Sequence, residues 1–304
     1  MVGTDTLVSV GLPVRNGAAR LGGVVRSVLA QDHENIQLVI SDNASTDETE
    51  EYCRDLAASD SRITYHRNPE NIGLLNNFIR VGRLARGTFF RWVGDDDRLD
   101  PGCLSRSLRA FAEDERLVLV TTGVAYTGPD GVTASASYDG TGLRSDDPVE
   151  RFGEMLRMLN ESHLLIDPLY GLMRRVPVVD IPRRNMLRED EVFAAKLALA
   201  GPWGHVPEVL AHRNWRPERI GLVGRRLGVP GWQAYFSSTL QYLELLRLLR
   251  EGDLTADQRR RARTAAHRMY ARRQRRTVSH RGRKLVRLAG DLVGRTPGRP
   301  SAGS

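Results

Sequence analysis

Short apolar runs and helical apolar stripes alternate along the first 122 residues. The runs are rich in β-branched and aromatic residues and predict buried strands, which cover 7–12, 36–40, 62–66, 88–93 and 117–122. In the segments between them apolar residues recur at helical spacing, which predicts helices over 21–29, 45–58, 75–85 and from Asp100-Pro101 onward. This β-α-β rhythm predicts an α/β fold with a Rossmann-like, mostly parallel sheet and helices on both faces.

Local signals refine the ends of these elements. Pro13 is expected to stop the first strand, and Ser45 with Glu48 forms a capping-box pattern that opens the second helix. Gly128 to Gly131 predicts the turn of a hairpin. The small, polar residues 136–147 predict a mobile loop.

The rhythm changes in the second half of the chain. Helices are predicted near 149–159 and 189–200, followed by a Leu-rich helix over 232–249 and a basic helix over 256–276. The Leu-rich helix is expected to pack on the main domain, with membrane contact as the alternative. We therefore divide the chain into a catalytic domain at 1–225, a basic helical appendage at 226–295 and a disordered tail at 296–304.

Composition limits the cellular setting. The chain has 304 residues and 40% hydrophobic residues, without the run of about 18 apolar residues that a membrane-spanning helix needs. The first residues lack the pattern of a signal peptide, and the two cysteines, Cys53 and Cys103, lack metal-ligand spacing. These features predict a cytoplasmic protein with two free thiols.

The net charge of +8 is unevenly distributed. Residues 255–304 contain 15 Arg or Lys and 2 Asp or Glu, a net of +13, so the other 254 residues carry 8 − 13 = −5. Three interpretations of this basic tail stay open: contact with an anionic membrane surface through 256–295, nucleic-acid binding, or a solvated Arg-rich helix. Nucleic acid is the least favoured, because Tyr270 is the only aromatic residue among the charges.

Three adjacent carboxylates, Asp95, Asp96 and Asp97, follow the strand at 88–93 and Gly94. Like charges this close repel one another unless water or a cation screens them. At the carboxyl end of a strand in an α/β sheet, that cation would be Mg²⁺ or Mn²⁺ carrying a phosphorylated ligand. The alternative is a solvated acidic turn in which Asp97 or Asp100 caps the next helix.

Several phrases in this order resemble glycosyltransferase family 2, which has the GT-A fold and binds nucleotide sugars. They lie between residues 6 and 220 and comprise Leu12–Asn16, Ser27–Gln31, Asp42–Asp47, Asn71–Gly73 with Ala85–Gly87, Asp167–Leu172, Glu189-Asp190 and Pro207–Arg213. The glycine-rich dinucleotide and P-loop motifs are absent, which argues against dehydrogenases and P-loop enzymes.

The resemblance implies a role for the first two strand ends. It places Pro13 and Arg15 against the nucleotide and the Asp42-Asn43 pair against the edge of the base, where a carboxylate and an amide suit a pyrimidine. The alternatives are an exposed charge for Arg15 and a turn-forming residue for Asp42. Asp47 is expected to cap the following helix.

The resemblance also implies a metal site at the acidic triplet. Gly94 stands where the family's metal motif usually has its first acid, so Asp95 is expected to face the ribose and Asp96 to bind the metal. Asp97 is a secondary candidate ligand. His212 is a candidate third ligand, with a partly buried structural histidine as the alternative.

Glu189-Asp190 matches the family's Glu-Asp motif, whose Asp is the general base. The resemblance therefore implies that Asp190 deprotonates an acceptor hydroxyl, that the metal takes the charge of the leaving group, and that the anomeric carbon is inverted. The alternative is that both acids only favour the helix N-terminus.

Together these expectations describe a metal-dependent inverting glycosyltransferase. The expected donor is a UDP- or dTDP-sugar, and the acceptor is a hydroxyl of a glycan, a lipid-linked sugar or a natural product. Two rivals are a nucleotidyltransferase with a similar sheet and a nucleic-acid-binding protein that acts through the tail. The first would need a glycine-rich basic loop after the first strand, which the chain lacks.

Overall fold

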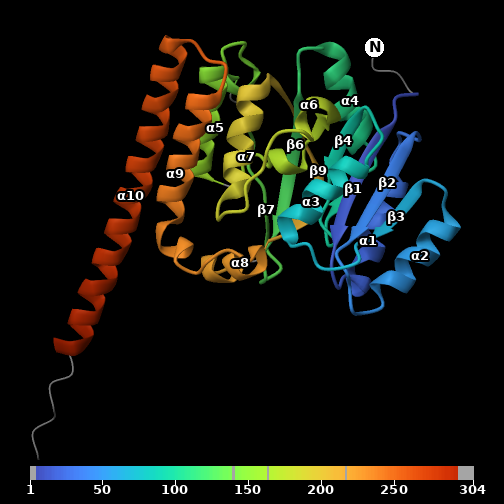
Figure 1. Cartoon of the computed structure of the whole chain (residues 1–304), viewed down its shortest axis with the longest axis horizontal. Helices are drawn as coiled ribbons and strands as arrows, with labels where there is room; N and C mark the ends of the chain where they lie inside the picture. The colour runs from blue at the N-terminus through green and yellow to red at the C-terminus, as the bar shows by residue number, and fades with distance from the viewer. Residues whose placement is uncertain (1–4, 139–140, 163, 216–217, 294–304) are drawn as a thin grey trace, which may run out of the picture.

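The computed structural model describes residues 5–138, 141–162, 164–215 and 218–293. The tail predicted at 296–304 lies outside these residues. A mixed sheet runs through the body (Figure 1), with the strand order β3-β2-β1-β4-β8-β6-β9-β5 and β7 paired to β6. Its strands are β1 (Val8–Val14), β2 (Ile36–Asp42), β3 (Ile63–Arg67), β4 (Phe89–Trp92), β5 (Arg98–Leu99), β6 (Leu119–Thr127), β7 (Thr133–Ala134), β8 (Leu172–Arg174) and β9 (Trp203–Asn214).

The helices are α1 (Ala18–Leu29), α2 (Thr49–Ser59), α3 (Leu74–Leu84), α4 (Cys103–Glu113), α5 (Pro148–Glu161), α6 (Arg175–Val178), α7 (Glu189–Ala200), α8 (Ile220–Leu227), α9 (Gln233–Glu251) and α10 (Ala256–Val293). The short 3-10 helices are η1 (Gly142–Arg144) and η2 (Pro168–Tyr170).

Parallel pairing is concentrated in the first half of the sheet. β3, β2, β1 and β4 are parallel neighbours, as the β-α-β rhythm predicts. β8 then enters antiparallel between β4 and β6, while β6 and β9 are parallel. The α/β class is confirmed, and the added antiparallel strands bring β9 beside the acidic turn through its pairing with β5.

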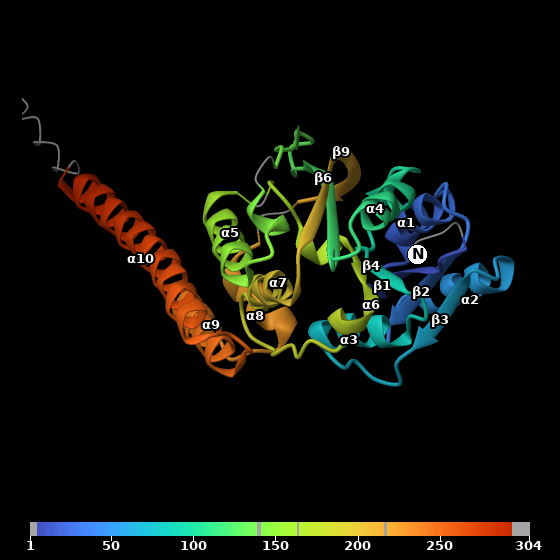
Figure 2. The same ribbon diagram turned by 90° about the horizontal axis from the view of Figure 1, so that it is seen from above.

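Three buried clusters give the molecule its layers. One side of the sheet packs against α1 and α4 through residues such as Val24 and Phe111. The other side packs against α3, α5 and α7, as Figure 2 shows from above. A third cluster joins α5 and α7 to the two C-terminal helices, with Phe152, Leu245 and Ala266 fully buried. The Leu-rich helix therefore packs on the body, as predicted.

Some element boundaries differ from the sequence prediction. β1 continues through Pro13 to Val14. It pairs with β2 over this whole length, whereas its pairing with β4 ends at Gly11, so Pro13 lies where the strand has one neighbour only. α4 begins at Cys103 rather than at Pro101. Ser45 does not cap α2; its hydroxyl instead donates to Asp42 at 2.5 Å. The hairpin turn after β6 is as predicted, with Gly131 at φ +77°.

In the loop after β7, Tyr138 and Leu143 are buried and contribute to the core.

Candidate active site

The acidic turn after β4 is closed by its last carboxylate. The Gly94 amide donates to Asp97 Oδ2 at 2.6 Å, and Arg213 Nε on β9 donates to Asp97 Oδ1 at 3.1 Å. Asp97 is only 5% exposed. Both of its oxygens are hydrogen-bonded within the protein, so Asp97 holds the turn in place, and its role as an alternative metal ligand stays a prediction. Neither Asp97 nor Asp100 caps α4, whose N-cap residue is Gly102.

Gly94 occupies a position that excludes a side chain. A Cβ at this residue would lie 3.0–3.3 Å from the carboxyl atoms of Asp97. This is closer than an ordinary van der Waals contact, so the glycine lets the turn fold over Asp97.

The other two carboxylates differ in their partners. Asp95 forms an ion pair with Arg20 of α1. Within the part of the chain that the structure describes, no ion pair forms at Asp96, whose main-chain oxygen accepts from Asn214 at 3.1 Å. Burial and the carboxylates of Asp97 and Asp95 raise the pKa of Asp96. Arg213 and Asn214 act in the opposite direction and offset part of this effect, but none of the described arginines forms an ion pair with Asp96.

This donor set fits Mg²⁺ or Mn²⁺ held by few protein ligands. The described residues contain no group of three or more His, Cys, Asp or Glu side chains arranged to hold a metal. A single carboxylate completed by phosphate oxygens and water is a common arrangement for Mg²⁺. His212, the other candidate ligand, has its Nε2 3.0 Å from Asp100 Oδ2. The structure therefore gives His212 a carboxylate partner, and its role as a third ligand stays a prediction.

The loop after β2 is built around Asp42, which has no exposed surface. Its Oδ1 accepts from the amide of Ser45 at 2.9 Å and from the Ser45 hydroxyl, and its Oδ2 accepts from the Tyr65 hydroxyl at 2.8 Å. This burial disagrees with the expectation that Asp42 touches the edge of a base. The hydrogen bonds fit the alternative of a turn-forming residue, and Asp42 holds the loop through its bonds to Ser45 and Tyr65.

Asn43 holds the neighbouring loops together. Its Oδ1 accepts from the amide of Ile72 at 2.9 Å, and its Nδ2 donates to Asn71 Oδ1 at 2.8 Å. Asp47 accepts from the amide of Thr49 at 3.1 Å, close to its expected role at the start of α2. Pro13 is buried, whereas Arg15 is exposed beside the Asn43 carbonyl. Of this group, Arg15 is the side chain open to an incoming ligand.

A cavity of about 390 Å³ opens on the other side of the acidic turn. Asp190, in the first turn of α7, lies on its wall together with Asp167, Tyr170 and Arg213. Asp190 is an exposed residue of this wall, open to solvent through the cavity. Burial, followed by the charge of Glu191, raises the pKa of Asp190 to about 6. A carboxylate with this pKa can take a proton near neutral pH.

Arg213 connects the cavity to the acidic turn. Besides Asp97, it pairs with Asp167, and its guanidinium carbon lies 3.5 Å from the centre of the Tyr170 ring. Burial alone would lower the pKa of Arg213, but Tyr170, Asp167 and Asp97 raise it well above its ordinary value. The cavity therefore contains a permanent positive charge. Sequence reasoning assigned no role to Arg213 or Asp167, although both lie within family-like phrases.

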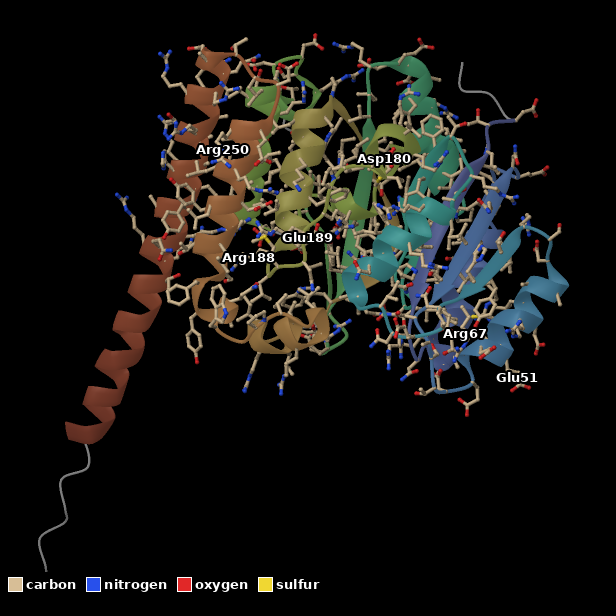
Figure 3. The ribbon with its side chains drawn as sticks, viewed as in Figure 1. Glu51, Arg67, Asp180, Arg188, Glu189 and Arg250 are labelled. Atoms are coloured by element: carbon tan, nitrogen blue, oxygen red, sulfur yellow. The ribbon has the colours of Figure 1, made fainter. Side chains whose placement is uncertain are left out.

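The acids on either side of Asp190 face other elements. Glu189, at the N-terminal end of α7 (Figure 3), pairs with Arg183 at 2.7 Å and is buried. Glu191 accepts from Gln241 of α9 at 2.9 Å and from Arg273 of α10 at 2.6 Å. Glu191 also lines the cavity, but it is paired with Arg188 and Arg273, whereas none of the described arginines or lysines pairs with Asp190. Because Arg273 is one of many arginines in a basic helix, the sequence alone did not single it out.

The arrangement defines a class of protein, the GT-A type of α/β fold with an acidic turn beside a cavity that carries Asp190, Asp167 and Arg213. The structure of S. aureus TarS residues 1–349 matches with a TM-score of 0.60 and 15% identity, covering 87% of this chain and 71% of that one. The mannosyltransferase PcManGT from Pyrobaculum calidifontis, in complex with GDP-Man and Mn²⁺, matches with a TM-score of 0.55 and 14% identity, covering 96% of this chain and 81% of that one.

The chain belongs to glycosyl transferase family 2, whose family model matches residues 9–176. A relative from Campylobacter jejuni subsp. jejuni, the GalNAc(5)-diNAcBac-PP-undecaprenol beta-1,3-glucosyltransferase, is 27% identical over 148 residues, which are 47% of this chain and 46% of that protein. The matched regions span less than half the length of each of the first four curated relatives. Among the described residues, no helix is long and apolar enough to cross a membrane.

Proposed function

We propose that this protein is an inverting glycosyltransferase that moves a sugar from a nucleoside-diphosphate sugar to an acceptor hydroxyl, with Asp190 as the general base. The observation that carries the proposal is the position of Asp190 on the cavity wall with a pKa raised to about 6. Its neighbours Glu189 and Glu191 are tied to arginines, so one carboxylate remains for proton transfer. Membership of the family supports this class over a nucleotidyltransferase.

The donor is proposed to lie between the strand-end loops and the acidic turn. Arg15 is exposed beside the loop that Asp42 and Asn43 support, and Asp95 lies at the edge of the acidic turn, held by Arg20. The structural neighbours support a nucleotide-sugar donor, because one was solved with UDP-GlcNAc and the other with GDP-Man. We favour UDP or dTDP as the nucleotide.

Asp96 is proposed to hold Mg²⁺ or Mn²⁺. When bound, this cation would offset the charge that develops on the departing nucleoside diphosphate. The protein's own contribution is to leave Asp96 free of ion pairs among the described residues while Asp95 and Asp97 are paired with arginines. Supporting this choice, the mannosyltransferase neighbour was solved with Mn²⁺.

Proton transfer is the step for which the cavity is best equipped. An acceptor hydroxyl in the cavity would donate to Asp190, which takes the proton as the oxygen attacks the anomeric carbon from the face opposite the leaving group. Attack and departure on opposite faces invert the configuration, and this needs one protein carboxylate only. Arg213 keeps its charge and holds Asp167 at the cavity wall.

The first test replaces Asp190 by Asn. We expect the transfer rate to fall by about 10²–10⁴-fold, the usual contribution of a general base. Nucleoside diphosphate binding in calorimetry should stay unchanged, because Asp190 lies on the cavity side. At pH 7 the unfolding midpoint should change little, because Asp190 is exposed and water screens its charge. Transfer at the wild-type rate would contradict the assignment.

The second test separates the metal role from folding. Asp96→Asn should abolish the gain in UDP affinity on adding Mn²⁺, whereas Asp55→Asn on the exposed face of α2 should leave that gain intact. A panel of UDP-, dTDP- and GDP-sugars, scored by thermal shift with Mn²⁺, would identify the nucleotide. If UDP bound equally well to the wild-type protein with and without Mn²⁺, the metal assignment would be wrong.

A further inference from the structure

Large apolar side chains gather on the outside of α8 and the start of α9. Trp232 is 54% exposed, Tyr235 77% and Phe236 56%, and Ile220 and Leu222 of α8 are also exposed. The rings of Trp232 and Phe236 lie 6.5 Å apart. We name these five residues the α8–α9 surface. Solvent exposure of several adjacent large apolar side chains is unfavourable in a soluble monomer and marks an interaction surface.

The surface is surrounded by positive charge. Residues 215–243 contain four arginines and a single acid, Glu218. Arg219, Arg225 and Arg226 are exposed on or next to α8, and Glu218 pairs with Arg226. α8 thus presents exposed aliphatic and basic residues within eight positions, the composition of a helix that lies in a membrane interface.

Helices α8 and α9 are hydrogen-bonded to the segment that precedes Asp190. Asn185 donates to the carbonyl of Leu227 at 2.7 Å, and the amide of Leu187 donates to Gln233 Oε1 at 3.3 Å. Arg188 Nε donates to Ser237 of α9 at 3.4 Å. In Figure 1, α8 and the start of α9 lie at the lower end of the body, and the C-terminal half of α10 extends past the same end.

We propose that the α8–α9 surface docks on an anionic lipid bilayer, with its aromatic and aliphatic side chains in the interfacial region and its arginines against the headgroups. Trp and Tyr are favoured at this depth because their rings are apolar and their N–H and O–H groups reach water. The proposal differs from contact through α10 alone: apolar residues of α8 and α9 insert, while the net charge of +13 in residues 255–304 attracts the protein to the bilayer.

The composition favours a bilayer over other occupants. In a symmetric contact between two copies, the exposed arginines of α8 would approach the same arginines of the partner, which is unfavourable. Base stacking would use the aromatic rings but not Ile220 and Leu222. A bilayer takes aliphatic side chains, aromatic side chains and arginines at successive depths.

The test is flotation of the full-length protein with vesicles of phosphatidylcholine mixed with phosphatidylglycerol. We expect the wild-type protein to float with these vesicles and to bind phosphatidylcholine vesicles more weakly. The triple variant Trp232→Ser, Tyr235→Ser, Phe236→Ser should lose about tenfold or more in vesicle affinity. Because these side chains are exposed, its unfolding midpoint should stay near that of the wild type.

Two matched controls separate this surface from the rest of the C-terminal helices. Leu243→Ser removes an apolar side chain of similar exposure, 53%, from the same helix, and should change affinity less than twofold if binding is local. Arg268→Gln with Arg272→Gln removes two exposed charges from α10 and should weaken binding only in a salt-dependent way.

Three outcomes would overturn the proposal. The first is vesicle binding by the triple variant at the wild-type affinity. The second is a dimer in size-exclusion chromatography that the triple variant abolishes, which would identify a second copy as the occupant. The third is absence of vesicle binding by the wild-type protein together with tight binding of a single-stranded oligonucleotide. None of these readouts depends on glycosyl transfer, so the proposed function can fail or hold separately.

Discussion

The two sides of the candidate active site are held together in different ways. In the strand-end loop after β2, Asp42 bonds with Ser45 three residues away and with Tyr65 on the adjacent strand. At the cavity, Arg213 reaches Asp97 across 116 positions of the chain, and Arg273 reaches Glu191 across 82. The loop is therefore a local scaffold, while the cavity depends on a few arginines that join distant elements. Loss of one such arginine should affect several parts of the site at once.

The largest effect is expected at Arg213. Arg213→Gln would leave Asp97 and Asp167 without their cationic partner in a mostly buried setting. We expect a loss of about 3 kcal/mol in the free energy of unfolding, at the lower end of the range for breaking a buried ion pair. Urea denaturation at pH 7 measures this. A loss below about 1 kcal/mol would mean that the cavity does not depend on this arginine.

A smaller effect is expected in the strand-end loop. Asp42→Asn replaces one accepting oxygen by an amide donor beside Ser45 and Tyr65, and it weakens the attraction to Arg67, whose Nε lies 3.7 Å from Asp42 Oδ2. We expect a cost of about 1–3 kcal/mol in unfolding free energy, as for a buried hydrogen-bonding group left unsatisfied. The same urea experiment checks it. If Asp42→Asn cost more than Arg213→Gln, our ranking of the two regions would be reversed.

The next prediction concerns pH. Asp190 acts in its deprotonated form, so transfer should fall about tenfold per pH unit as the pH drops below about 6. The pKa of Asp190 is higher in the folded than in the unfolded protein, so ionisation of this residue lowers the free energy of unfolding as the pH rises toward about 6. The Asp190→Asn variant lacks this pH-dependent loss. The kcat–pH profile of the wild-type protein measures the acidic limb. A limb centred near pH 4 would show that Asp190 is not the titrating base.

Arg273 sharpens the pH prediction. Its guanidinium offsets the charge of Glu191, and that charge helps to raise the pKa of Asp190. Arg273→Gln should therefore move the acidic limb of the kcat–pH profile to higher pH. Arg272→Gln, a neighbouring exposed position, is the matched control and should leave the limb in place. An unchanged limb in Arg273→Gln would limit this arginine to a packing role.

The smallest effect is expected at the surface. Arg226 and Glu218 form an exposed pair in which the side chains keep 59% and 39% of their accessible surface. Arg226→Gln should change unfolding free energy by less than about 1 kcal/mol, because water and salt screen such pairs. The urea midpoint should match the wild type within error. A larger change would show that α8 stabilises the body more than its exposure suggests.

The same contrast explains what the sequence could predict. Strands and helices of the first half follow from periodicity within ten or so neighbouring residues, and each predicted element is present. Their bounds differ: besides the shifts at Pro13 and Pro101, α2 begins at Thr49 and β6 continues to Thr127. The phrases that resemble the family predicted which strands end in polar residues and in what order these ends follow along the chain. Side-chain partners did not follow, because Ser45 and Glu48 match a capping box in sequence while the fold turns Ser45 toward Asp42.

Long-range partners were beyond local reasoning for a physical reason. The pairing of β9 with β5 sets His212 opposite Arg98 and beside Asp100, and this register is decided by the whole sheet. Arg273 is one of 15 basic residues in 255–304, and nothing in their spacing indicates which one is buried. Such contacts require the packing of α10 on α5, which only the folded structure provides.

Gly94 has a consequence for how this site could change by mutation. An acid introduced at position 94 would meet the carboxyl group of Asp97 at about the distance where a Cβ already crowds it, 3.0 Å. The Asp97 side chain would have to shift by a few tenths of an ångström, which would disturb its pair with Arg213. Positions 94 and 97 are therefore expected to be epistatic: an acid introduced at position 94 should destabilise the turn less in a chain whose residue 97 has also changed.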